Sequence, residues 1–274
     1  MKQRNIFILS LCLFIFSTFS CFAQELKGLN ALITGGSRGI GEACAYAFAR
    51  EGANVAIAVA KSIEEAEEVA EKIRTNFGVD AMVCTCDVSN PEQVKSAVQS
   101  MVSKWGSIDI LVNNAGIVHS SGAEDLSYED WKRMIDVNLS GVFLCAKEAG
   151  CQMITQGNGG SIINISSICA HIVVVPQKQC HYNAAKAGVG MLTKSLAVEW
   201  AEHGIRVNAI SPGYIHTKLL DFAKPLHAGW MERTPMKTLG SPEDIAEAVV
   251  YLASHKAKFI TGSDWVIDGG YVCP

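Results

Sequence analysis

Tyr182 and Lys186 are four positions apart in the segment Tyr182-Asn183-Ala184-Ala185-Lys186. On a helix this spacing places the phenol and the ammonium one turn apart on the same face. A free phenol has a pKa of about 10, so a tyrosine that acts as acid and base near neutrality needs a neighbour that favours the phenolate. A lysine cation is such a neighbour. The pair alone is equally compatible with a structural tyrosine beside a lysine on an ordinary amphipathic helix.

A glycine-rich turn joins the first apolar stretch of the chain to a helix-like segment. The stretch 29–34 is followed by the pattern Gly35-x-x-x-Gly39-x-Gly41, and the helix-like segment begins at Ile40. Glycines permit a tight bend and let the backbone approach a ligand, while the first amides of the helix and its dipole attract phosphate. The pattern therefore predicts a dinucleotide phosphate site. A strand-to-helix turn without a ligand is the alternative.

Apolar and amphipathic segments alternate along most of the chain. Strands are expected near 29–34, 54–60, 80–86, 108–112, 160–166, 205–210 and 264–267. Helices are expected near 40–51, 63–76, 91–104, 128–154, 182–202 and 242–253, the last of them capped by Ser241. This alternation predicts the α/β class, with a Rossmann-type doubly wound parallel sheet of about seven strands and helices on both faces. Because 49% of the 274 residues are hydrophobic, one large core and a single domain are expected.

Further motifs stand where predicted strands end. They are Asn113-Asn114-Ala115-Gly116, Ile162-Ile163-Asn164-Ile165-Ser166-Ser167, Pro212-Gly213-Tyr214-Ile215-His216-Thr217 and, near the end of the chain, Asp268-Gly269-Gly270. In this order, together with the glycine turn and the Tyr-x-x-x-Lys pair, they resemble the short-chain dehydrogenase/reductase family from about Leu26 to Tyr271. The resemblance implies that residues 24–274 form a dinucleotide-binding oxidoreductase domain, which moves a hydride between a nicotinamide and a carbonyl or secondary alcohol.

The resemblance also implies a catalytic set of Asn138, Ser167, Tyr182 and Lys186. Tyr182 would exchange a proton with the substrate oxygen, and Ser167 would hydrogen-bond that oxygen. Lys186 would depress the tyrosine pKa and hold the nicotinamide ribose. Asn138 would anchor a water that joins Lys186 to solvent.

Ser167 is assigned as the catalytic serine by aligning the end of the predicted strand 160–166 with the same strand in the family. Ser167 lies fifteen positions before Tyr182, whereas the family often has thirteen, a position that Cys169 occupies here. The alignment implies two extra residues in the intervening loop, and Ser166 is the alternative.

The end of the second predicted strand bears on the choice of cofactor. An acidic residue there holds the ribose of NAD, whereas cations accommodate the 2′-phosphate of NADP. The strand 54–60 is followed by Lys61 and Ser62, with Arg38 in the glycine turn and no carboxylate at that position. NADP(H) is therefore expected, with NAD as the alternative. The turn and the resemblance together give the cofactor residues Gly35, Ser37, Arg38, Gly39, Ile40, Gly41, Lys61, Ser62, Asp87, Val88, Asn113, Ala115, Gly116, Tyr182, Lys186, Pro212, Gly213, Ile215 and Thr217.

The substrate is less clearly indicated. The long loop 170–181 is similar to that of a sugar and polyol branch with mannitol dehydrogenases and sorbose or xylulose reductases, and its His171, Gln177 and Gln179 suit a polyhydroxylated ligand. Its valines at 173–175 would instead suit a steroid, terpenoid or acyl chain. The segment 217–239 is expected to form a lid. A ketose, polyol or other small ketone is favoured; the alternatives are a 3-oxoacyl-thioester reductase, a membrane-associated steroid or lipid carbonyl reductase, and a non-catalytic cofactor-binding protein.

The first 23 residues have the features of a secretory signal peptide. Lys2 and Arg4 precede an apolar run, and Cys21-x-Ala23 offers small residues for cleavage. The 18 residues from Ile6 to Ala23 are marginal for a membrane span, which needs about 20. A lumenal or exported protein is therefore expected; a retained membrane anchor and a cytoplasmic enzyme are the alternatives.

Composition and cysteine spacing limit the other partners. The net charge of −4, without a basic stripe, argues against nucleic acid. Ten cysteines prove no disulfide, and buried free thiols are the simpler reading. Their spacing lacks the paired pattern of a zinc site, so no metal is expected. Apolar-faced helices at 187–200 and 245–253 resemble the subunit contacts of the family, which implies a homotetramer or homodimer.

Overall fold

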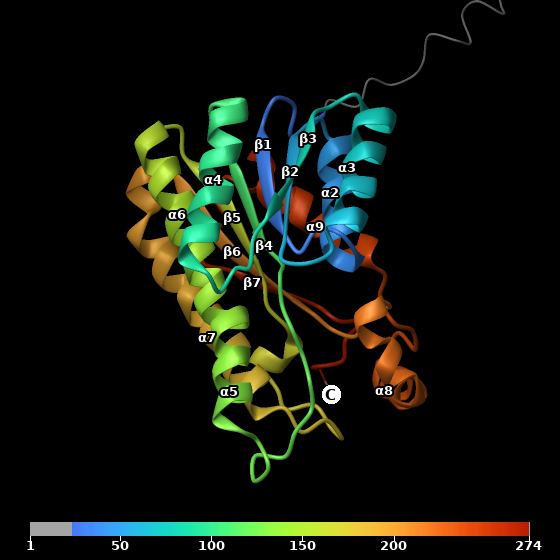
Figure 1. Ribbon diagram of the computed structural model, residues 1–274. Coiled ribbons are helices and arrows are strands. Elements are labelled where there is room, and N and C mark those ends of the chain that lie inside the picture. Colours follow the sequence, from blue (N-terminus) through green and yellow to red (C-terminus); the bar gives the residue numbers. More distant parts are fainter. Residues whose placement is uncertain (1–23, 274) are drawn as a thin grey trace, which may run out of the picture.

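The computed structural model describes residues 24–273, apart from the side chains of Leu219 and Phe222. The predicted leader, residues 1–23, lies outside this range. Seven parallel strands form one sheet in the order β3-β2-β1-β4-β5-β6-β7 (Figure 1). The strands are β1 (Asn30–Thr34), β2 (Asn54–Val59), β3 (Ala81–Thr85), β4 (Ile110–Asn113), β5 (Gly160–Ile165), β6 (Ile205–Pro212) and β7 (Asp264–Ile267). The predicted parallel sheet of seven strands is thus confirmed.

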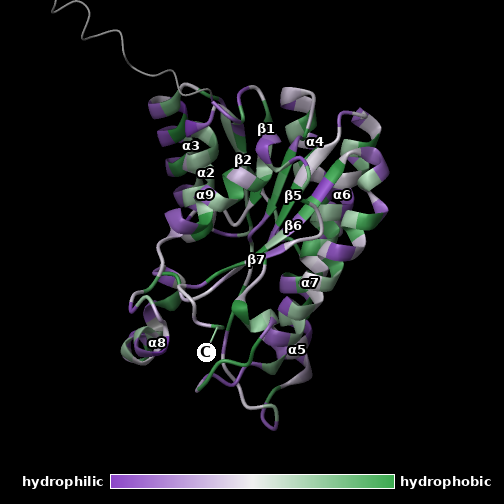
Figure 2. Ribbon diagram, turned by 180° about the vertical axis from the view of Figure 1, so that it is seen from behind, coloured by the Kyte–Doolittle hydropathy of each residue, from purple (hydrophilic) through white to green (hydrophobic). Residues whose placement is uncertain are grey.

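Helices cover both faces of the sheet. The core on one face joins the strands to α2 (Gly39–Arg50), α3 (Ile63–Phe77) and α9 (Pro242–Ala253). The core on the other face joins them to α4 (Pro91–Trp105), α6 (Gly141–Gln156) and α7 (Cys180–Glu199). Figure 2 shows apolar strands between helices whose polar residues face outward.

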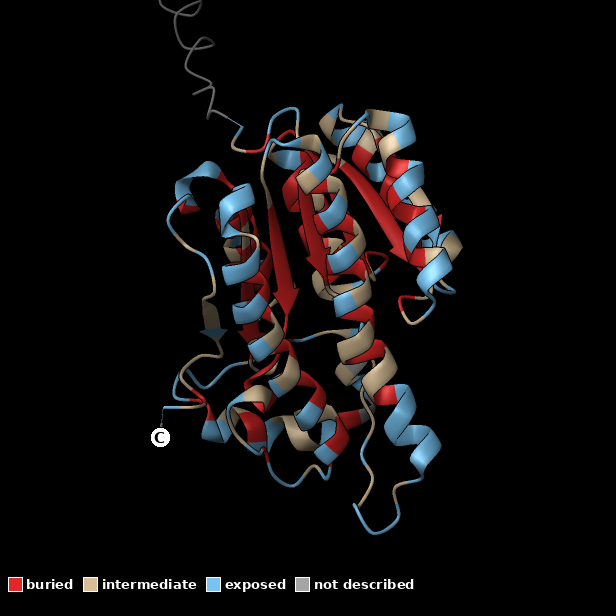
Figure 3. Ribbon diagram, turned by 90° about the vertical axis from the view of Figure 1, so that its left-hand side faces the viewer, coloured by how far each residue is buried: buried red, intermediate tan, exposed pale blue. Residues whose placement is uncertain are grey.

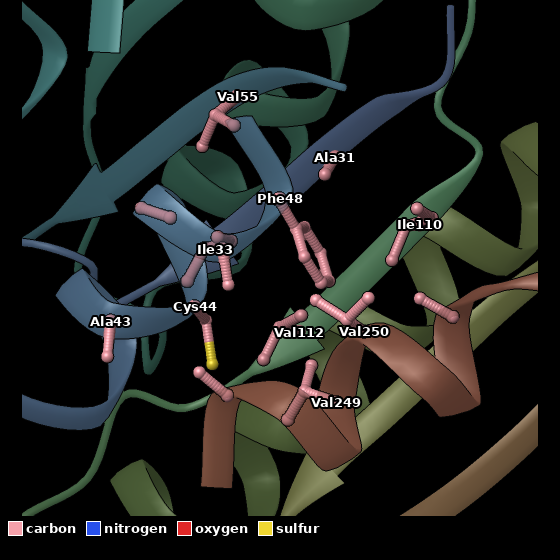
Figure 4. Close-up of a cluster of buried hydrophobic side chains, with 14 of the residues drawn as sticks. Ala31, Ile33, Ala43, Cys44, Phe48, Val55, Ile110, Val112, Val249 and Val250 are labelled. Carbon is pink, nitrogen blue, oxygen red and sulfur yellow. The ribbon is translucent and has the colours of Figure 1, made fainter. Parts of the chain in front are cut away.

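Residues on the inner strands are apolar in succession because both faces of each strand are covered. On β4, Ile110 and Val112 belong to the core with α2 and α9, whereas Leu111 between them belongs to the opposite core. Phe48 of α2 lies among Ile110, Val112 and Val250 in the first of these cores (Figure 4). Figure 3 shows the buried strands enclosed by helices with exposed outer surfaces.

One predicted helix differs from the structure. Instead of a continuous helix over 128–154, the chain forms α5 (Tyr128–Ile135), a π-helical turn at Asp136–Ser140 and then α6. Asn138 lies within this turn, where its amide Nδ2 donates to Ile117 O and its Oδ1 accepts from Ile117 N. A π-turn widens a helix locally and re-aims a side chain. Here it lets Asn138 bind the backbone that follows β4.

Two helix ends bear on the site. Helix α7 begins at Cys180, two residues before Tyr182. Helix α9 begins with the predicted Ser241 cap, which forms a full capping box with Asp244.

The predicted lid contains a 3₁₀ segment (Lys218–Leu226) and α8 (His227–Arg233). Within the described part of the chain, none of the helices has the length and apolar character needed to cross a membrane.

Candidate active site

Two adjoining cavities lie beyond the carboxyl ends of the strands, where ligands bind in open parallel sheets. The first, called here the cofactor cleft, runs from the glycine turn across the ends of β2 and β3. Its lining includes Gly35, Ser37, Arg38, Gly39, Ile40, Lys61, Ser62, Asp87, Val88, Ala115, Gly116 and Thr217. The second, called here the substrate cavity, is lined by Asn138, Ser167, Tyr182, Lys186, Pro212, Gly213 and Ile215, among others. Shared lining at Ile40, Asn114, Gly116, Ile117 and Thr217 joins the two.

The glycine turn has the form of a phosphate cradle. Gly35 and Gly39 have φ angles of +69° and +58°, which disfavour any side chain. A Cβ on Gly41 would lie 2.3 Å from the Gly35 carbonyl oxygen, so the turn folds this tightly only with glycine there. Arg38, at the N-cap of α2, makes no side-chain cap. The first amides of α2 are therefore not capped by that side chain, and the turn fits a pyrophosphate.

Cationic and hydroxyl side chains line the cofactor cleft at the end of β2. Arg38, Lys61 and Ser62 lie there without an acidic neighbour on that strand. Asp87 also lines the cleft, but its carboxylate accepts hydrogen bonds from Ser89 Oγ at 2.6 Å and from Arg133 at 3.3 Å. The residues present thus fit an anionic dinucleotide.

Two predicted cofactor residues line neither cavity. Asn113 is buried in the sheet, where its Nδ2 donates to Asn164 Oδ1 at 2.9 Å and to Val142 O at 3.3 Å. Because side chains alternate along the strand, the next residue, Asn114, lines both cavities instead. Gly41 also lines neither cavity, since its place is against the Gly35 carbonyl. In the structure, Asn113 joins neighbouring strands and Gly41 permits the tight turn, which are structural roles.

The four residues of the predicted catalytic set lie around the substrate cavity. Ser167 lies two residues beyond the end of β5, and its hydroxyl is close enough to the Tyr182 phenol to lower the pKa of that phenol. Lys186 Nζ donates to the Ile165 carbonyl at 2.8 Å and lies 5.7 Å from the centroid of the Tyr182 ring. The sequence elements that bring them together are the end of β5, the first two turns of α7 and the π-turn. This arrangement places a proton donor, a hydroxyl and a cation beside one another.

Comparison with known proteins bears on this arrangement. A family model described as enoyl-(acyl carrier protein) reductase matches residues 35–272. A crystal structure of a short-chain type dehydrogenase/reductase from Mycobacterium marinum superposes with a TM-score of 0.89 at 44% identity, covering 92% of this chain and 98% of that one. The chain belongs to the short-chain dehydrogenase/reductase family. Its members bind NAD(P) and transfer hydride, so the protein is an NAD(P)-dependent oxidoreductase.

Curated relatives in this family differ in substrate. A sorbose reductase from Candida albicans is 44% identical over 91% of this chain and 89% of its own length. A probable NADP-dependent mannitol dehydrogenase from Yarrowia lipolytica is 42% identical over 91% and 90%. A 3-oxoacyl-[acyl-carrier-protein] reductase from Staphylococcus aureus is 43% identical over 88% and 97%. The predicted likeness to the sugar and polyol branch is confirmed. The 3-oxoacyl-[acyl-carrier-protein] reductase has nearly the same sequence identity to this chain.

The electrostatics of this dehydrogenase site differ from expectation in one respect. Burial raises the pKa of Tyr182 well above 10, and the Ser167 hydroxyl lowers it only in part. Burial also lowers the pKa of Lys186 to about 8. The pKa of Tyr182 therefore does not show the depression expected from Lys186, since burial of the phenol has the largest effect on it. The phenol therefore keeps its proton at neutral pH, which is the form that reduction of a carbonyl requires.

The structure separates the two candidate serines of the dehydrogenase. Ser166 Oγ donates to the Lys186 carbonyl at 3.2 Å within α7, whereas the Ser167 hydroxyl lies beside the Tyr182 phenol and lowers the pKa of that phenol. We expect Ser167→Ala to lower turnover about 10²-fold, as loss of one donor to a developing oxyanion does. Ser166→Ala should instead cost about 1 kcal/mol of stability and leave turnover within a few fold. Steady-state rates and thermal melts of both variants measure this, and the reverse pattern would assign the catalytic serine to Ser166.

The pKa of Lys186 gives the dehydrogenase a predicted pH dependence. Since this pKa is lowered to about 8, the ammonium is present below that pH and is lost above it. The kcat/KM for the nicotinamide cofactor reports the free enzyme, so we expect it to fall as pH rises through about 8. Lys186→Met should give a kcat/KM that is low at every pH and does not fall near pH 8. A wild-type profile that stays level from pH 7 to pH 10 would contradict the assignment.

Sequence reasoning missed several residues that line the substrate cavity. Asn114, Ile117 and Ser120 come from the segment after β4, and Tyr214 and Trp230 come from the segments after β6. Asn114 belongs to the motif that predicted a cofactor contact, directly after Asn113. Trp230 belongs to the predicted lid, whose Leu220, Ala223 and Leu226 also line the cavity. Of the valines at 173–175, Val174 reaches the cavity and the other two are exposed.

Proposed function

We propose that this enzyme is an NADP-dependent reductase of ketoses or other small ketones and, in the reverse direction, a dehydrogenase of the corresponding polyols or alcohols. One observation carries the proposal: Ser167, Tyr182 and Lys186 converge on a cavity that adjoins a phosphate cradle. The sugar and polyol substrates named for two relatives support the substrate class. Polar side chains in the cavity agree with it.

The side chains act on the substrate oxygen. Tyr182 donates its proton to the carbonyl oxygen during reduction, and Ser167 hydrogen-bonds the same oxygen and orients it. Lys186 supplies a positive charge beside the phenol as negative charge develops there. Asn138 fixes the backbone at Ile117, which lines both cavities, and we retain for it the role of anchoring a water on the proton path. A bound nicotinamide supplies the hydride.

The preference for NADP over NAD rests on charge. Arg38 and Lys61 offer a 2′-phosphate two cations, and Ser62 offers a hydroxyl. The carboxylate of Asp87 is already hydrogen-bonded to Ser89 and Arg133. The relative named as an NADP-dependent mannitol dehydrogenase is consistent with this choice.

A 3-oxoacyl-thioester reductase is the second candidate. It is favoured by the identity to the Staphylococcus aureus enzyme and by apolar side chains in the lid wall of the cavity, including Leu220, Leu226 and Trp230. An acyl chain would lie against this wall.

A substrate panel tests the proposal. Purified protein is assayed for NADPH oxidation with L-sorbose, D-fructose, hydroxyacetone, an acetoacetyl thioester and a 3-ketosteroid. The proposal expects the highest kcat/KM among the hydroxylated ketones. A dominant rate with the thioester would move the enzyme to the second class, and a dominant rate with the steroid would move it to the lipid reductases.

Assembly into a homotetramer or homodimer is part of the proposal. Exposed apolar side chains occur on α7, on α9, in β7 and in the segment before it; they include Met191, Val198, Tyr251, Phe259 and Val266. Val198 is 80% exposed and Phe259 is fully exposed. Such surfaces are costly in a monomer and are covered in symmetric oligomers. Light scattering should therefore give the mass of two or four chains.

A further inference from the structure

Three polar side chains in the loop before α7 suit a hydroxylated ligand by their chemistry, but two of them are already engaged. His171 lies outside the substrate cavity, where its Nε2 is 3.0 Å from Asp264 Oδ2 and 3.2 Å from Ser211 Oγ. Gln177 lines the cavity. In the amide orientation that satisfies its neighbours, its Oε1 accepts from the Tyr214 hydroxyl at 3.1 Å and from Trp230 Nε1 at 3.0 Å.

Gln179 differs from both. It lines the substrate cavity and is only 8% exposed. Its Nε2 donates to Cys169 Sγ at 3.1 Å and to Asn183 Oδ1 at 3.3 Å, so both amide hydrogens are used. Its Oε1 accepts no hydrogen bond from the described residues. This oxygen is nevertheless not one of the polar atoms that are fully buried without a partner in that part of the chain. The oxygen is therefore open to the cavity, and the two bonds at the nitrogen hold it in place.

The position of Gln179 relates this oxygen to the reacting centre. Gln179 is the N-cap residue of α7, three residues before Tyr182 and seven before Lys186, and all three side chains line the substrate cavity. Its partner Cys169 is tied to the catalytic serine, since Cys169 N donates to Ser167 Oγ at 3.1 Å. A carbonyl oxygen held by Tyr182 and Ser167 thus has a fixed hydrogen-bond acceptor close beside it.

We propose that Gln179 Oε1 accepts a hydrogen bond from a substrate hydroxyl on the carbon next to the reacting carbonyl, so that the enzyme selects α-hydroxy ketones over simple ketones. This inference rests on the proposed function and narrows its substrate class. A buried acceptor that has no partner among residues 24–273 disfavours a ligand that brings only apolar groups to it. The 2-ketoses carry such a hydroxyl on both sides of their carbonyl.

Two nearly isosteric ketones measure this selectivity. Hydroxyacetone and 2-butanone differ in whether the carbonyl neighbour carries a hydroxyl or a methyl, and kcat/KM with NADPH is measured for each. Gln179→Met removes the acceptor while keeping the length of the side chain. We expect it to lower the preference for hydroxyacetone about tenfold, as loss of one hydrogen bond does. Gln179→Asn, which withdraws the acceptor by one methylene, should act in the same direction if the methionine variant does not fold.

Gln177→Met is the matched control, because it makes the same change two residues away on an amide whose oxygen is already engaged. It should leave the preference unchanged, even if a looser lid lowers both rates together. A preference that survives in both Gln179 variants, or a wild type that does not favour hydroxyacetone, overturns the inference while ketone reduction stands. A wild type that reduces neither ketone but reduces an acetoacetyl thioester overturns the proposed function, and the inference with it.

Discussion

Replacing Tyr182 with phenylalanine should lower turnover by 10²–10⁴-fold, the loss expected when a general acid is removed. The ring keeps its packing, and only the proton donor is lost. Because Ser167 and Lys186 remain, weak residual reduction is expected. Binding of NADPH should persist, since the phosphate cradle and the end of β2 are unchanged. Steady-state kinetics and fluorescence titration with NADPH measure the two quantities separately.

Tyr214→Phe is the control for this experiment. Tyr214 lines the same cavity, and its hydroxyl is hydrogen-bonded to Gln177. Because its hydroxyl is held by that residue, its loss should change turnover by less than tenfold. If Tyr182→Phe retained near-normal turnover, or if Tyr214→Phe were the more damaging change, Tyr182 would not be the proton donor.

Much of the framework was predictable because its signals are local. The parallel sheet follows from apolar runs that alternate with amphipathic segments, and the structure has all seven strands at the expected places. The glycine turn was predictable because a left-handed φ at Gly35 and Gly39 leaves few other residues possible. The convergence of Ser167 with Tyr182 could be expected once β5 and α7 were placed in a family with known topology.

The remaining features depend on contacts between distant segments. Asn113 and Asn114 are chemically identical, and only the register of β4 against β5 decides which one faces the cleft. The π-turn places Asn138 where it can bind Ile117, 21 residues away. The raised pKa of Tyr182 depends on how closely the surrounding segments enclose it. Composition and periodicity carry no signal for such contacts.

The cofactor preference gives a second large effect. The double variant Arg38→Ala with Lys61→Ala should weaken NADPH by about 10²-fold or more relative to NADH. Each charge-assisted hydrogen bond to the 2′-phosphate contributes about 1.5–3 kcal/mol, and NADH has no phosphate there to lose one. The expected result is therefore a change in the ratio of the two dissociation constants, measured by titration of each cofactor under the same salt concentration.

Lys218→Ala supplies the matched control for that ratio. Lys218 lines the same cleft but belongs to the lid and not to the segment after β2, so we expect its loss to remove a positive charge without removing a contact to the 2′-phosphate. It should weaken both cofactors by a similar small factor. If the double variant weakened NADPH and NADH equally, Arg38 and Lys61 would act only through the general field of the cleft. If the wild type itself bound NADH more tightly, the absence of an acid at the end of β2 would not be what decides the cofactor.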